Sequence, residues 1–280
     1  MNSRERFNAT MHYMERDRCP IFDFGFWKET LIVWRDYGYP EGADRNEFFG
    51  MDEWLVVPVE TCIFPCFEEK ILEDKGDIEI AINNDGVTVE RAKFLGSIPR
   101  HLDHTLKDRA SWEKEFKWRF DGKASKRYPK DWEKKLAEYA ATSFEHPLGV
   151  NGGSLFGRIR DWMGIEGVSF IVYDDRKLFE EMVETLATCV IDSIAKVFED
   201  NVRIDYAVMW EDMCYRKGPI LSPKIFREVM IPHYKRITSF LKKHGVDIVM
   251  LDCDGDISQL VSLWLEAGVN TLYPMEVGTW

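Results

Sequence analysis

Acidic residues follow three apolar runs in the last third of this chain. The runs are residues 206–210, 246–251 and 271–275, and the acids that follow them are Glu211, Asp212, Asp252, Asp254 and Glu276. Short apolar runs separated by amphipathic helical patterns predict βαβ units and a parallel sheet. The carboxyl ends of parallel strands meet at one edge, so these carboxylates are expected to lie together. Carboxylates that share a dry site raise the pKa of one member, which can then act as a general acid.

We therefore predict an acidic active site. The predicted catalytic residues are Asp212, Asp252, Glu211 and Glu276. Glu211 and Asp212 alternate along one strand end, so one of them is expected to point into the surrounding helices. The predicted substrate-binding residues are the polar and aromatic side chains near strand ends, namely Asp23, Trp27, Glu60, Asn151, Trp210, Asp254 and Tyr273. Helix capping is the alternative role for Asp254, and core packing is the alternative role for the aromatic residues.

The elements that must position these residues follow from periodicity. Strands are expected near residues 20–26, 54–60, 147–151, 205–210, 246–252 and 270–275. Helices are expected over residues 2–15, 28–37, 176–200, 223–244 and 257–267, with two surface helices within 106–139. A capping box of Asn2 and Glu5 is expected to start the first of these helices, and a Ser222 cap followed by Pro223 is expected to start the fourth. Residues 77–91 instead alternate with period two around Asp85 and Gly86, which predicts a β-hairpin inserted outside the parallel sheet.

Composition limits the class of protein. Hydrophobic residues make up 45% of the 280 residues, which is ample for a single domain over residues 1–280. The net charge of −12 argues against nucleic acid or an anionic membrane as a partner. No signal peptide and no apolar run of roughly 18 residues is evident, so we expect a cytoplasmic protein. The six cysteines are then expected to be reduced thiols.

Several segments resemble the uroporphyrinogen decarboxylase superfamily. They are residues 210–236, beginning Trp-Glu-Asp-Met-Cys-Tyr, the Asp-Cys-Asp-Gly of 252–255, residues 267–276, Arg-Glu-Arg-Phe at 4–7, and Asn-Gly-Gly-Ser-Leu-Phe-Gly at 151–157. The resemblance implies an α/β fold of the TIM (β/α)8 barrel type. It also implies two further strands after Glu276, so we expect a barrel truncated after about six strands, with an inserted β-hairpin.

This superfamily contains porphyrin-pathway decarboxylases and cobalamin-dependent methyltransferases. The decarboxylases hold substrate carboxylates with an Arg-rich motif after the first strand, where this chain has only Lys28 within residues 22–28. The branch that uses coenzyme M has a His-x-Cys-Gly zinc motif, where this chain has Asp252 and Asp254. Zinc is therefore disfavoured, and no metal site is predicted.

The resemblance thus favours a corrinoid-dependent methyltransferase. Such an enzyme moves a methyl group between a small methylated substrate or tetrahydrofolate and a corrinoid protein. Methylcobalamin or a corrinoid carried by that partner is the expected cofactor, and a homodimer is a further expected assembly. Two alternatives stay open: a uroporphyrinogen decarboxylase of porphyrin and haem biosynthesis, and a non-catalytic barrel fragment that acts with a partner.

Overall fold

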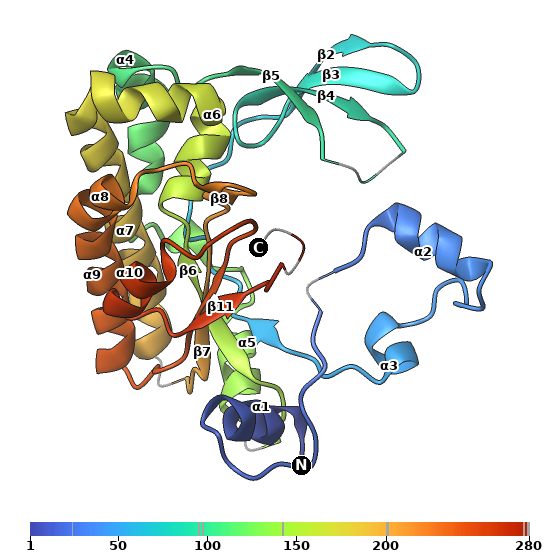
Figure 1. The fold of residues 1–280 in the computed structure, drawn as a ribbon. Helices are drawn as coiled ribbons and strands as arrows, with labels where there is room; N and C mark the ends of the chain where they lie inside the picture. The colour runs from blue at the N-terminus through green and yellow to red at the C-terminus, as the bar shows by residue number, and fades with distance from the viewer. Residues whose placement is uncertain are drawn as a thin grey trace. The chain divides into compact units, whose positions relative to one another are not determined.

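The computed structural model describes residues 1–23, 25–94, 96, 98–141, 143–199, 202–276 and 278. The chain divides into two compact units, drawn in Figure 1. The first unit comprises residues 1–55, 67–104 and 145–147, and the second comprises residues 56–66, 105–144 and 148–280. A single domain over residues 1–280 stays a prediction.

A parallel sheet forms the centre of the second unit. Its strand order is β1 (Leu55–Val56), β6 (Leu148–Gly153), β7 (Tyr206–Trp210), β10 (Val249–Asp252) and β11 (Thr271–Tyr273). The strand β7 pairs in parallel with both β6 and β10, and β10 pairs in parallel with β11. The predicted pairing of residues 205–210 with 246–252 is therefore confirmed, as is an α/β fold of partial-barrel type.

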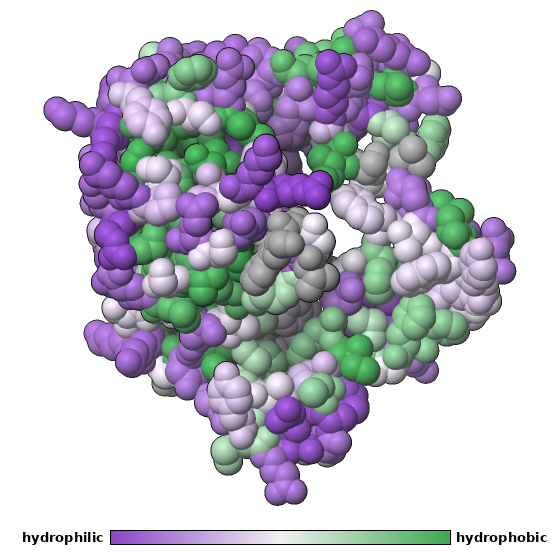
Figure 2. All heavy atoms as spheres, viewed as in Figure 1, coloured by the Kyte–Doolittle hydropathy of each residue, from purple (hydrophilic) through white to green (hydrophobic). Residues whose placement is uncertain are grey.

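Helices pack along this sheet. They are α6 (Phe156–Asp174), α7 (Arg176–Glu199), α8 (Pro223–Ile225), the π-helix η4 (Phe226–Met230), α9 (Ile231–Lys243) and α10 (Val261–Glu266). Figure 1 shows α7, α9 and α10 side by side against the strands. Ser222 caps the start of α8 by accepting from the backbone N–H of Ile225, with Pro223 in the first turn, as predicted. In Figure 2 hydrophilic residues lie along the outer border of the molecule at α8 and α9, and hydrophobic residues lie next to them on the side toward the strands. Amphipathic helices produce this arrangement.

Residues 105–144 form short segments of this unit. They are α4 (Arg109–Ser111), the π-helix η1 (Trp112–Phe116), the 3-10 helices η2 (Lys117–Phe120) and η3 (Ser125–Arg127), and α5 (Trp132–Ala140). The two predicted surface helices correspond to the helical residues 109–120 and 132–140, and each buries one face, with Trp112 or Trp132 on it, and leaves the other exposed. The guanidinium of Arg127 is also buried, and it donates to the carbonyls of Glu60, Cys62, Arg119 and Asp121. It thereby ties this region to the loop after β1.

The first unit contains the predicted hairpin. Its antiparallel sheet has the order β2 (Lys70–Asp74), β3 (Ile78–Ile82), β4 (Val87–Ala92) and β5 (Arg100–His104). The strands β3 and β4 form the hairpin predicted for residues 77–91, in a sheet separate from the parallel one. Its helices are α1 (Ser3–Met11), α2 (Lys28–Arg35) and α3 (Arg45–Phe49). The predicted capping box of Asn2 and Glu5 starts α1.

The strand predicted at residues 20–26 is wrong. None of the described residues 20–23, 25 and 26 is in a strand. The backbone N–H of Ile21 donates to the carboxylate of Asp52 at 2.9 Å, and that of Gly25 donates to the carboxylate of Asp23 at 2.7 Å. Side chains thus take the donors that a strand ladder would need. The parallel sheet consequently has five strands among the described residues, where six were expected.

Two small strands lie in the loop that follows β7. They are β8 (Cys214–Tyr215) and β9 (Gly218–Pro219), which pair antiparallel. No helix among the described residues is long and apolar enough to cross a membrane.

Close packing between β6 and β7 yields a first testable expectation. Gly149 lies opposite Tyr206, and a Cβ added at Gly149 would come within 2.3 Å of the tyrosine ring. Tyr206 is fully buried and has no room to move, so we expect Gly149→Ala to lower the free energy of unfolding by about 1–3 kcal/mol. Chemical denaturation measures this change. Gly96→Ala is the matched control, because its added Cβ would meet no atom closer than 3.6 Å. Equal stability of the two variants would contradict the expectation.

Candidate active site

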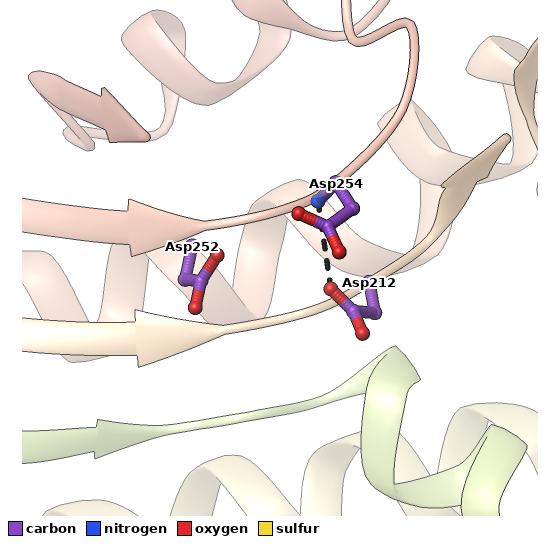
Figure 3. Close-up of side chains that lie close together, drawn as sticks. All are labelled: Asp212, Asp252 and Asp254. Carbon is purple, nitrogen blue, oxygen red and sulfur yellow. Dashed lines mark hydrogen bonds between the residues drawn. The ribbon is translucent and has the colours of Figure 1, made fainter. Parts of the chain in front are cut away.

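Three carboxylates come together at the carboxyl edge of the parallel sheet. Asp252 is the last residue of β10, Asp212 lies two residues beyond β7, and Asp254 lies two residues beyond β10. One oxygen from each lies within 4.8 Å of the others (Figure 3). The backbone N–H of Asp254 also donates to Asp212 Oδ1 at 3.5 Å. We call these residues the acid cluster, and the predicted proximity of Asp212 and Asp252 is confirmed.

The backbone conformation after β7 orients the side chains of the acid cluster. The N–H of Glu211 donates to the carbonyl of Asp252 at 2.9 Å, which extends the strand ladder to the sheet edge. Asp212 then has a φ of 39°, in the left-handed region that residues other than glycine seldom occupy. Such strain gathers at functional sites, where the surrounding structure holds it. The turn at Asp212 leaves its side chain beside Asp252 while Glu211 faces the helices.

The cluster shifts the proton affinity of its members. Burial raises the pKa of Asp252 to about 7, with the negative charges of Asp212 and Asp254 adding to the rise. Burial likewise raises the pKa of Asp254, with the charges of Asp212 and Glu276 adding and that of Arg160 opposing. Asp252 therefore gains and loses a proton near neutral pH, which is the requirement for a general acid or base.

The acid cluster offers only hard oxygen ligands. Three carboxylate oxygens at this spacing suit a cation such as Mg²⁺ or Ca²⁺ better than zinc. Cys214 and Cys253 are the nearby thiols and are buried. A hydrogen bond with Cys214, together with burial, raises the pKa of the Cys253 thiol, so this thiol stays protonated at neutral pH. The residues do not fit a zinc site that activates a thiol.

Glu211 has a different role from the one predicted. Its carboxylate is fully buried and accepts from the backbone N–H groups of Leu155 at 2.8 Å, Phe156 at 2.8 Å and Gly157 at 2.9 Å. The hydroxyl of Tyr234 donates to it at 2.5 Å. Burial raises the pKa of Glu211, and these hydrogen bonds oppose the rise. Because three of these contacts cap the buried start of α6 and the fourth joins Glu211 to Tyr234 of α9, we correct the catalytic assignment of Glu211 to a structural one.

Three other predicted residues lie beside the acid cluster. Trp210 and Tyr273 are the register partners of Asp252 on β7 and β11. Burial raises the pKa of the Tyr273 hydroxyl, and the charge of Asp252 adds to the rise. Glu276 accepts from the backbone N–H of Gly255 at 2.7 Å. The chemical roles predicted for these residues stay predictions.

The remaining predicted residues are more dispersed. Asn151, on β6, lines a separate cavity together with Trp210. Glu60 is exposed on the loop after β1. Asp23 and Trp27 belong to the first unit. The substrate-binding roles of these residues likewise stay predictions.

Two arginines at this site were missed from the sequence. The guanidinium carbons of Arg158 and Arg160 each lie 5.4 Å from the centroid of the Trp210 ring. Arg160 also donates to the carbonyl of Asp212, and its Nη2 lies 3.8 Å from Asp212 Oδ2. Sequence reasoning sought cations only near Lys28. The usable signal was the glycine-containing stretch 151–157, which leads directly into both arginines.

Comparison with known proteins agrees with this fold. Residues 148–274 match the family model of uroporphyrinogen decarboxylase (URO-D). A solved structure, a methyltransferase from Methanosarcina mazei, superimposes with a TM-score of 0.55 at 12% identity, covering 97% of this chain and 75% of that one. At this identity the likeness concerns the fold alone. No curated protein matches the chain significantly.

Proposed function

We propose that this chain is a methyltransferase, and the match of residues 148–274 to the family model of uroporphyrinogen decarboxylase supports its place in that superfamily. Its reaction would move a methyl group between a small methylated substrate or tetrahydrofolate and a corrinoid carried by a partner protein. The partial-barrel fold shared with a methyltransferase supports this proposal. The acid cluster is the observation that carries it.

The acid cluster supplies what demethylation needs at the leaving atom. When a methyl group leaves an ether oxygen or an amine, that atom must take up a proton. Asp252, whose pKa is raised to about 7, holds such a proton at neutral pH. The neighbouring charges of Asp212 and Asp254 favour retention of the proton until transfer. Arg160 holds Asp212 in place.

The surroundings of the cluster fit a corrinoid brought by a partner. When bound, a corrinoid supplies the centre that accepts or donates the methyl group. Asp254 is exposed, so the cluster is reachable from solvent. Cys214 and Cys253 are buried and give no nucleophile that would compete for the methyl group.

The decarboxylase alternative has less support. Uroporphyrinogen carries eight carboxylates, and the acid cluster would repel such a polyanion. Arg158 and Arg160 do add cations near Trp210, but Arg160 is already engaged with Asp212. The cavity that Arg158 lines has a volume of about 130 Å³, below the roughly 300–1,000 Å³ typical of sites for drug-sized ligands.

A methyl-transfer assay tests the proposal. Purified protein is mixed with methylcobalamin and tetrahydrofolate, and in parallel with reduced cobalamin and a panel of methoxy and methylamine compounds. We expect the cobalamin absorbance to change only when both the protein and a methyl donor or acceptor are present. Coproporphyrinogen formed from uroporphyrinogen would contradict the proposal in favour of the decarboxylase. Inactivity in both assays would favour the non-catalytic fragment.

A further inference from the structure

Arg160 extends from α6 to the edge of the acid cluster, and its guanidinium is bound on several sides. Nη1 donates to the backbone carbonyl of Asp212, and Nη2 donates to Asp161 Oδ1 at 3.0 Å. The guanidinium carbon lies 5.4 Å from the centroid of the Trp210 ring, and the side chain is only 16% exposed. A planar guanidinium can make these contacts together, because its donors point in fixed and different directions. The protein therefore uses this cation itself.

The contact with Asp212 falls on a strained backbone turn. Asp212 has a φ of 39°, a conformation that is costly for residues with a side chain unless their surroundings hold it. The carbonyl that accepts from Arg160 belongs to the same residue. This hydrogen bond restrains the peptide group that leaves the turn, and so it opposes relaxation of the turn.

The helix α6 and the end of β7 hold each other at two neighbouring points. The Glu211 carboxylate accepts from the backbone N–H groups of residues 155–157, and Arg160, in the next turn of α6, donates back to Asp212. The two segments are in close contact, since a Cβ added at Gly157 would lie 2.6 Å from the Glu211 carbonyl oxygen. Residues 211 and 212 are thus fastened to one helix, one through its side chain and the other through its backbone.

The Asp212 carboxylate has a donor on each side. Arg160 Nη2 lies 3.8 Å from Oδ2, and the backbone N–H of Asp254 donates to Oδ1 at 3.5 Å (Figure 3). Among the described residues, the titratable groups that interact with Asp252 are Asp212 and Asp254, from the loops after β7 and β10, and Tyr273 of β11. The negative charge of Asp212 adds to the raised pKa of Asp252, so the position of Asp212 affects the acidity of its neighbour.

We propose that Arg160 is a positioning residue that holds the left-handed turn at Asp212 and thereby keeps the Asp212 carboxylate beside Asp252. In this role Arg160 acts on Asp252 through Asp212 and transfers no proton itself. The proposal rests on the proposed function only in giving Asp252 the role of general acid. The arrangement of the three side chains is independent of any methyl transfer.

The titration of Asp252 in Arg160→Gln tests this proposal without cobalamin. The protein is labelled with ¹³C at its aspartate carboxyl carbons, and the Asp252 resonance is identified by its loss in Asp252→Asn. When the turn relaxes, the charge of Asp212 moves away from Asp252, so the midpoint of this titration should fall by about 1 pH unit. Loss of the positive charge alone would have the opposite sign, because it leaves the remaining carboxylates less compensated.

Arg160→Lys separates geometry from charge and keeps a long side chain that favours folding. Lysine retains the positive charge but lacks the planar fork, so it cannot replace the guanidinium contacts with Asp212 and Asp161 together. We therefore expect this variant to lower the Asp252 midpoint as well. Arg216→Gln is the charge control, since Arg216 is exposed in the loop that follows β7. It should not lower the midpoint.

A double variant tests whether Arg160 acts through Asp212. Asp212→Asn removes the charge and suits the turn, since asparagine tolerates the left-handed region better than most residues. It should lower the Asp252 midpoint, and Arg160→Gln added to it should lower the midpoint no further.

Three results would overturn the proposal. They are an unchanged or higher Asp252 midpoint in Arg160→Gln, a parental midpoint in Arg160→Lys, and a further fall when Arg160→Gln is added to Asp212→Asn. Parental midpoints together with methyl-transfer activity would remove the positioning role and leave the proposed function standing. The expected midpoints in a protein without methyl-transfer activity would keep the role of Arg160 and remove the proposed function.

Discussion

Asp252→Asn is expected to lower the rate of methyl transfer by roughly 10²–10⁴-fold, the range that loss of a general acid produces. Asparagine keeps the shape of the side chain but has no proton to give near neutral pH. Asp252 ends β10 and is only partly buried, so its carboxyl group contributes little to the core. Activity should therefore fall without loss of folding.

The pH dependence follows from the raised pKa of Asp252. A general acid acts in its protonated form, so activity should decline as pH rises through about 7. The free energy of unfolding should also fall as pH rises, because the folded state binds the proton more tightly than the unfolded chain does. The contribution of the Asp252 carboxyl to this free energy is fully present below its ordinary pKa of 3.8 and is lost as pH rises through about 7. At pH 8 Asp252→Asn should consequently be more stable than the parent, by about 1–2 kcal/mol after allowance for solvent screening.

Rate measurements and urea denaturation at pH 5 and pH 8 check both effects. Asp131→Asn is the matched control, since Asp131 is exposed before α5 in the same unit. The control should change neither turnover nor the pH dependence of stability. Turnover of Asp252→Asn within twofold of the parent would exclude Asp252 as the general acid. A variant that fails to fold would contradict the small structural role assigned to it.

Much of the second unit could be predicted from the sequence because its signals are local. The apolar runs at 206–210 and 246–251 are short and separated by a long amphipathic pattern, which only a parallel crossover accommodates. Strand direction then places Asp212 and Asp252 at one edge. The same locality explains the success at Ser222 and Pro223, which mark a helix start within four residues.

The failures required information from distant residues. The aromatic run at 20–26 looks like a strand, yet the N–H of Ile21 is taken by Asp52, 31 residues away. In the sequence Arg158 and Arg160 look like ordinary helix residues. Only the tertiary structure places their guanidinium groups at the Trp210 ring. The alternation of side chains along a strand left open whether Glu211 or Asp212 faces the site. The backbone turn at Asp212, with a φ of 39°, places Asp212 at the site and Glu211 toward the helices. The periodicity of the sequence does not predict such a turn.

Glu211→Ala should be the most destabilising single substitution considered, at about 3–5 kcal/mol. The change leaves the N–H groups of Leu155, Phe156 and Gly157 without their acceptor at the buried start of α6. It also leaves the hydroxyl of Tyr234 unpaired. No water has easy access to replace the carboxylate, because Glu211 is fully buried.

Urea denaturation should show this loss as a lower midpoint with an unchanged slope. Glu133→Ala, an exposed acid in the first turn of α5, is the control and should change stability by less than about 0.5 kcal/mol. Tyr234→Phe removes only one donor and should cost about 1–2 kcal/mol. In the double variant with Glu211→Ala the two losses should not add, since both break the same hydrogen bond. A Glu211→Ala protein that is as stable as the parent but inactive would return Glu211 to the catalytic residues, because a carboxylate that merely caps α6 would lower stability first.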